Sequence, residues 1–123
     1  MTDHTTGEDQ FRKGVEQFNR GQFFEAHETW EEIWLAAPEP TRTFLQGIIQ
    51  VAAAFHHFTR GNRAGAQSLL EAGLKKLVRF PATFRGIQLD ELRAAAKEWV
   101  AHLALGRSPG NEQLPHIRPA PKS

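Results

Sequence analysis

The chain has 123 residues, of which 40% are hydrophobic and 24% are charged, with a formal net charge of +1 and no cysteine. This length suffices for one domain with a buried core, and the lack of cysteine excludes disulfides and thiolate chemistry. The acidic N-terminus is unlike a signal peptide, and no apolar run approaches the roughly 20 residues that span a membrane, so we expect a cytoplasmic protein without a membrane partner.

Charge is distributed unevenly along the chain. Residues 1–40 carry nine acidic and three basic side chains, whereas residues 41–123 carry five acidic and twelve basic ones. We interpret this as two halves that pack together with complementary fields. The basic residues are spread over several segments rather than clustered with aromatic residues, so we expect no nucleic-acid partner.

The apolar spacing predicts five helices, over residues 8–20, 23–36, 41–60, 63–79 and 89–105. Gly21 and Gly61 each follow a helix end, and Pro38 stops the second helix. The third helix is apolar almost all round, which places it in the middle of the protein. The predicted fold is all-α, a compact bundle of these five helices in a single domain.

Residues 18–26 resemble residues 58–66, and both copies read as helix–glycine–helix. This predicts two antiparallel hairpins with a weak likeness to a tetratricopeptide unit, although two copies are too few for a solenoid. We expect the domain to cover residues 1–105, with residues 1–7 flexible. Residues 106–123 should form an extended proline-rich tail, in which Leu114 and Ile117 are the expected anchors.

The second predicted helix places two ionisable residues inside its apolar sector. Phe23, Trp30 and Trp34 form the expected core stripe, and His27 and Glu31 lie beside it at a spacing of four residues, so their side chains can meet. A buried ionisable pair is costly without compensation. The expected flanks of the core are Ala26, Ile33, Phe24 and Leu35, and the residues expected to face water are Glu25, Glu28, Thr29 and Glu32.

The third predicted helix has a polar stripe of Gln46, Gln50 and His57, with the small Ala53 between them. If the second and third helices are neighbours, five polar side chains converge at one candidate site. These are His27, Glu31, Gln46, Gln50 and His57.

Three interpretations of this cluster stay open. It is a structural hydrogen-bond network that fixes helix register, a small-molecule or catalytic pocket that Trp30 or Trp34 also lines, or a divalent metal site with His27, Glu31 and His57 as ligands. The zincin motif is broken at Glu31, and no phosphate-binding loop or evident nucleophile is present, so no catalytic residue is assigned.

Three blocks in this order resemble the bacterial and archaeal family known as domain of unknown function 309. They are FNRGQFFEAHETWEEIW at residues 18–34, LQGIIQVAAAFHH at 45–57 and GNRAGA at 61–66, and the resemblance extends from about residue 11 to residue 105. It implies a small all-α fold and no established activity, substrate or cofactor. The family signature includes the positions of His27, Glu28, Glu31, Trp34, Gln46, Gln50 and one histidine near the end of the third helix.

That histidine is either His56 or His57, and we favour His57 because it shares the stripe with Gln46 and Gln50. Two functions remain open. The first is a ligand- or metal-binding protein, or an enzyme, built on the polar cluster. The second is a helical protein-interaction module in which the cluster is only structural. The sequence leaves the oligomeric state open, and a homo-oligomer is compatible with it.

Overall fold

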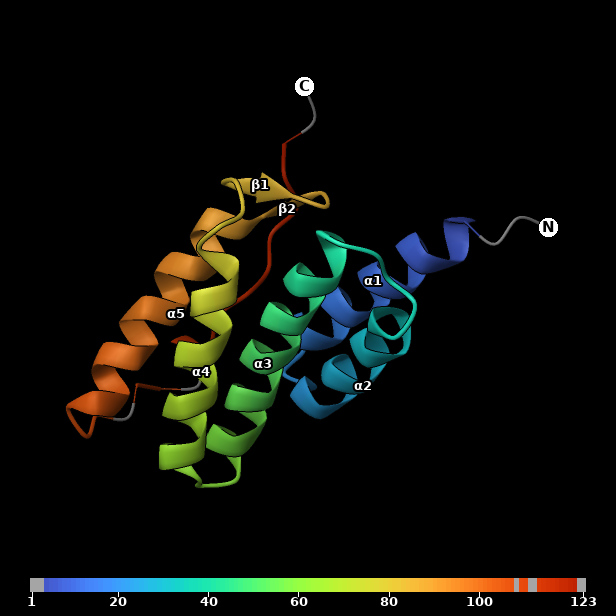
Figure 1. The fold of residues 1–123 in the computed structure, drawn as a ribbon. Coiled ribbons are helices and arrows are strands. Elements are labelled where there is room, and N and C mark those ends of the chain that lie inside the picture. Colours follow the sequence, from blue (N-terminus) through green and yellow to red (C-terminus); the bar gives the residue numbers. More distant parts are fainter. Residues whose placement is uncertain (1–3, 108, 111–112, 122–123) are drawn as a thin grey trace.

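A computed structural model of the protein describes residues 4–107, 109–110 and 113–121, and within them the fold is helical, as predicted (Figure 1). No helix in this part of the chain is long and apolar enough to cross a membrane. The elements are α1 (His4–Asn19), α2 (Phe23–Trp34), α3 (Thr41–Thr59), α4 (Arg63–Leu77), β1 (Thr83–Phe84), β2 (Ile87–Gln88) and α5 (Leu89–Ala104).

The helix boundaries follow the signals in the sequence. Gly21 and Gly61 adopt φ angles of +78° and +85°, which suit glycine directly after a helix. Asn62 caps α4, since its side-chain oxygen accepts a hydrogen bond from the Gly65 amide. One boundary differs from the prediction, because α1 begins at His4 rather than at residue 8. The predicted flexibility of residues 1–7 stays a prediction, and residues 1–3 lie outside the described residues.

The long helix α3 lies at the centre, between α2 and α4 (Figure 1). Nine of its residues are buried, more than in any other described helix, which confirms the prediction made from its apolar surface. Phe44, Ile48 and Phe55 on this helix are among the largest fully buried side chains. Two antiparallel hairpins, α1–α2 and α3–α4, therefore pack on one another, and α5 packs against α4.

Glycines set how closely each hairpin packs. A Cβ atom on Gly73 would lie only 2.8 Å from the carbonyl oxygen of Gly47, so α3 and α4 approach backbone to backbone. In the other hairpin, Gly14 leaves space for the indole ring of Trp30, whose Nε1 donates to the carbonyl oxygen of Phe11 at 3.1 Å. Side chains at these glycines would force the helices apart.

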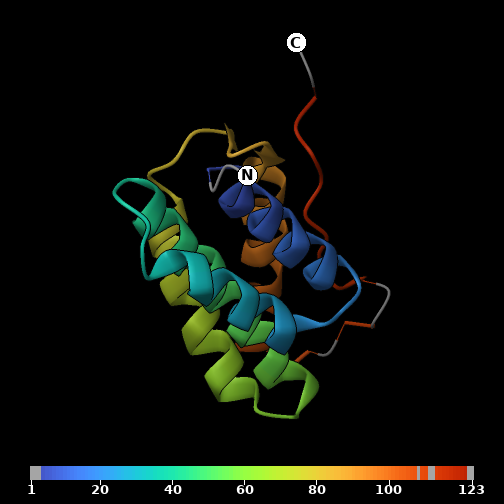
Figure 2. The ribbon, with the colours of Figure 1, turned by 90° about the vertical axis from the view of Figure 1, so that its right-hand side faces the viewer.

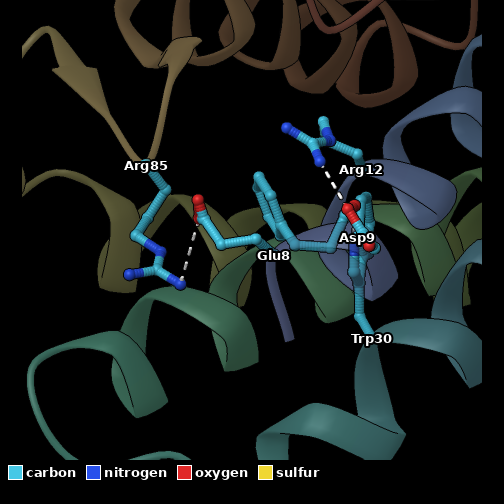
Figure 3. A network of polar contacts seen from close by, with 6 residues as sticks. Glu8, Asp9, Arg12, Trp30 and Arg85 are labelled. Atoms are coloured by element: carbon cyan, nitrogen blue, oxygen red, sulfur yellow. Dashed lines mark hydrogen bonds and ion pairs between the residues drawn. The ribbon is translucent and has the colours of Figure 1, made fainter. Parts of the chain in front are cut away.

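A small hairpin that the sequence analysis did not predict joins α4 to α5. Arg85 and Gly86 link β1 to β2, and both have positive φ angles, of 53° and 79°. Figure 3 shows this turn beside α1, where the Arg85 guanidinium lies 3.8 Å from the Glu8 carboxylate. The neighbouring ion pair between Asp9 and Arg12 lies within α1. The Arg85–Glu8 pair thus connects the hairpin turn to the first helix.

The described part of the C-terminal tail is extended and returns to the body of the protein. Figure 2 shows it running beside α1 and α5. Ile117 is 1% exposed and Leu114 packs against the core, as the sequence predicted for these two anchors. The tail is therefore part of the packed structure at its middle, and residues 108, 111–112 and 122–123 lie outside the described residues.

Candidate functional site

Helix α2 is rotated about its axis relative to the prediction. Thr29, expected to face water, is 6% exposed, and its hydroxyl donates to Oε1 of Gln17 on α1 at 2.6 Å. Phe24 and Leu35, expected to flank the core, are 45% and 71% exposed. The hydrogen bond to α1 brings Thr29 inward, so the opposite edge of the apolar sector, which carries Phe24 and Leu35, faces the solvent. Hydrophobic periodicity could not reveal this, because the apolar sector of the helix is wider than its buried face.

His27 and Glu31 meet as predicted, but at the surface rather than in the core. Nε2 of His27 lies 3.6 Å from Oε2 of Glu31, and the two side chains are 25% and 50% exposed. Nδ1 of His27 is buried and has no hydrogen-bond partner among the described residues. The pair therefore has a solvent-facing side at Glu31 and one unsatisfied ring nitrogen on its inner side.

The polar stripe of α3 does not converge on His27. Oε1 of Gln50 accepts from Nζ of Lys76 on α4 at 3.0 Å, and Nδ1 of His57 lies 3.1 Å from Nδ2 of Asn62, the cap of α4. Gln46 lies half-buried on the same stripe. The expectation of one five-residue cluster is thus wrong in its geometry for Gln50 and His57. Both side chains are paired toward α4, because their edge of α3 faces that helix.

His56, rather than His57, belongs to the neighbourhood of His27. The ring of Phe24 lies 6.0 Å from that of His27 and 5.2 Å from that of His56, measured between centroids. Burial, and then the positive charges of Arg60 and the neighbouring histidines, lower the pKa of His56 from its ordinary value. The neutral imidazole is therefore favoured, and the preference for His57 as the signature histidine stays a prediction.

The two tryptophans of α2 have different surroundings. Trp30 is fully buried with its indole N–H satisfied by Phe11, so it is a core residue and does not reach a solvent-facing pocket. Trp34 is half-buried, and the guanidinium of Arg42 lies over its ring at 4.9 Å. Nε1 of Trp34 is buried without a hydrogen-bond partner in the described part of the chain.

A divalent metal would need several ligands in one place. Within residues 4–107, 109–110 and 113–121, no three histidine or carboxylate side chains are grouped closely enough to hold a metal ion. Of the three predicted ligands, the structure brings His27 and Glu31 together and pairs His57 with Asn62 instead.

The exposed face of α2 carries a stripe that the sequence analysis missed. Phe24, Glu28, Glu31 and Leu35 follow one another at spacings of four, three and four residues, so they share one face, and all four are exposed. We call these four residues the outer α2 stripe. An open pocket of about 400 Å³ adjoins its C-terminal half and is lined by Glu28, Glu31, Glu32, Trp34 and Leu35.

Two relatives resemble this chain. An uncharacterized protein of Aquifex aeolicus is 34% identical over 93 residues, which are 75% of this chain and 28% of the relative. The uncharacterized protein YpuF of Bacillus subtilis is 39% identical over 56 residues, which are 45% of this chain and 32% of YpuF. The chain thus spans about a third or less of the length of these relatives.

This face is built by one continuous region of the chain. The residues from Phe11 of α1 to Leu69 of α4 include the whole of α2 and α3, and with them the outer α2 stripe, His27 and His56. The family described as domain of unknown function (DUF309) matches the chain over residues 11–69, which confirms the resemblance drawn from its three sequence blocks.

Proposed function

We propose that this chain is a helical protein-interaction module and that its outer α2 stripe binds a basic region of a partner protein. The observation that carries the proposal is the exposure of Phe24 and Leu35, at 45% and 71%, on either side of two carboxylates. Exposed apolar side chains grouped on one face are typical of protein contacts. Phe24 supplies an aromatic anchor of the kind that dominates binding energy at interfaces.

The spacing of the stripe suits a partner helix or strand. Leu35, the residue that caps the C-terminal end of α2, lies eleven positions after Phe24, which corresponds to about 16 Å along the helix axis. Between them lie Glu28 and Glu31, and the exposed Glu25 and Glu32 flank the stripe. This acidic strip favours lysine or arginine on the partner, because complementary charge speeds encounter and fixes the orientation of the two proteins.

The polar residues inside the helices support an interaction module over an enzyme. Gln50 is bonded to Lys76 and His57 to Asn62, so each joins α3 to α4 or to its cap. Such pairs act as structural connections between helices. The relatives also support a module, because the region similar to this chain makes up 28% and 32% of their lengths and so occurs within longer proteins.

Photo-crosslinking in the native host tests this proposal. A benzophenone amino acid placed at Phe24 or at Leu35 should yield one and the same protein adduct. The same probe at Leu105, which is 66% exposed beyond α5, is the matched control and should not yield that adduct. The adduct should also disappear when Glu28 and Glu31 are both changed to lysine. Equal adducts from all three positions, or none from the stripe, would refute the proposed interface.

A second candidate function is binding of a small ligand or divalent cation beside His27. It is favoured by one observation, the buried Nδ1 of His27 without a hydrogen-bond partner among the described residues. Titration with Zn²⁺ or Ni²⁺, followed by NMR of the histidine rings, tests it. Stoichiometric shifts at His27 that Glu31→Gln weakens would support a cation site, whereas unchanged ring signals would exclude these two ions as ligands.

A further inference from the structure

The C-terminal segment, residues 113–121, lies along a surface formed by the end of α1, the β1–β2 hairpin and α5, which it contacts through Asn19, Ile87 and Trp99 (Figure 2). We call this surface the tail groove. Its most specific contact is made by Asn19, whose Nδ2 donates to the carbonyl oxygen of Ile117 at 2.9 Å. Oδ1 of the same side chain accepts from the amide of Ile117 at 2.7 Å. One side-chain amide thus holds both backbone polar groups of a single residue, 98 positions away along the chain.

The hairpin holds the segment in a second way. The amide of Gln88 donates to the carbonyl oxygen of Arg118 at 2.8 Å, and the amide of Ala120 donates to that of Gly86 at 2.9 Å. Pro119 forms an antiparallel bridge with Ile87. The segment therefore pairs with the edge of the hairpin through one antiparallel bridge and its flanking hydrogen bonds, which resembles the β-augmentation by which many domains capture extended peptides.

Most of these contacts reach the main chain of the segment, so sequence preference comes from a few side chains. Ile117 is 1% exposed and is the apolar anchor. Nε of Arg118 lies 3.3 Å from the carboxylate of Glu91 on α5. Pro119 has no amide hydrogen. None is needed at this position, because the amides that donate hydrogen bonds from the segment are those of Ile117 and Ala120. The segment thus presents an apolar residue, a basic residue and a proline in that order at Ile117, Arg118 and Pro119.

We propose that the tail groove is a peptide-binding site, occupied within the chain by residues 113–121 and open to an extended apolar–basic–proline segment of a partner protein. A tethered segment has an effective concentration in the millimolar range, so it excludes partners until it is displaced. A cavity of about 690 Å³ beside the segment, lined by Phe11, Val15, Arg85 and Pro119 among others, offers room for further side chains of the partner. This surface goes beyond the outer α2 stripe and uses other elements.

A labelled peptide with the sequence of residues 113–121 tests the proposal by fluorescence polarisation. The full chain carrying Ile117→Asp releases its own segment and should bind the peptide at least about tenfold more tightly than the wild type. His116→Asp introduces the same charge at an exposed neighbouring position and is the matched control, which should bind like the wild type. Adding Asn19→Ala to Ile117→Asp should abolish the gain.

Hydrogen exchange in the wild type keeps the test independent of whether Ile117→Asp folds. Excess unlabelled peptide should speed exchange of the Ile117 and Ala120 amides, since both are bonded only while the segment occupies the groove. A peptide with aspartate in place of its isoleucine should have no effect. Unchanged exchange with the native peptide would overturn the proposal. A stable dimer with exchanged tails, detected by light scattering, would overturn the assignment to a different partner chain.

Discussion

Two surfaces of this molecule carry apolar anchors, and they differ in what covers them. In the tail groove, Ile117 is 1% exposed and its backbone is clamped by Asn19, so the surface is already filled by the chain itself. On the outer α2 stripe, Phe24 and Leu35 remain open to solvent. The comparison teaches that the buried anchor should contribute strongly to the stability of the fold, whereas the exposed anchors should contribute little to it. Substitutions should therefore separate the two surfaces.

Ile117→Ala should have the largest effect on stability. It removes a fully buried side chain and should lower the free energy of unfolding by about 3 kcal/mol, measured by urea denaturation. His116→Ala alters the exposed neighbour and should change stability by less than about 0.5 kcal/mol. Equal losses from the two variants would contradict the assignment of Ile117 as the anchor.

Asn19→Ala should have an intermediate effect. It removes both hydrogen bonds to the backbone N–H and C=O of Ile117 and leaves these two part-buried groups unpaired, for an expected loss of about 1–2 kcal/mol. Asn19→Asp keeps the acceptor and loses the donor, so thermal melting should place it between the wild type and Asn19→Ala. A melting temperature unchanged by Asn19→Ala would show that the clamp contributes nothing.

Phe24→Ala should cost little stability. The ring is 45% exposed and contacts two partly exposed histidines, so we expect a loss below about 1 kcal/mol. Phe23→Ala, one residue earlier, removes a ring that is 3% exposed and is the matched comparison, with an expected loss of about 3 kcal/mol. Similar losses from both would mean that Phe24 is a structural residue.

The pH dependence near the stripe should be the smallest effect. Because burial lowers the pKa of His56 below its ordinary value of 6.5, the folded protein binds fewer protons there than the unfolded chain. The contribution of His56 is therefore fully present above about pH 6.5 and declines as the pH falls below it. His56→Gln should flatten the decline measured between about pH 7 and about pH 5. Parallel curves for wild type and His56→Gln would contradict this.

The helical framework was predictable because its signals are local. Gly21 and Gly61 adopt the positive φ angles that end helices, and the boundaries predicted from them lie within one or two residues of those in the structure at most ends. The hairpin was missed because its turn is Arg85-Gly86, in which only the glycine is a usual turn residue, and its strands have two residues each. A search for two-residue turns containing glycine could have found it.

The candidate site was predicted less well, because its geometry depends on how whole helices rotate. The spacing of His27 and Glu31 is a property of one helix, and their side chains meet as this spacing predicts. The direction of Gln50 depends on Gly47 and Gly73, which bring α3 and α4 together and place Gln50 beside Lys76. The pairing of Asn19 with Ile117 joins residues 98 positions apart, and no sequence pattern marks it.

The central claim is that the outer α2 stripe binds a basic partner. The most direct test is to measure, at several salt concentrations, the affinity of this protein for the partner that crosslinking identifies. Binding should weaken as salt rises from about 50 mM to about 300 mM, because exposed charges are screened. Changing Glu28 and Glu31 to lysine should weaken it at least about tenfold. The control changes Glu71 and Glu98, which are exposed on α4 and α5, to lysine and should retain wild-type affinity. Equal affinities for both double variants, without salt dependence, would contradict the account.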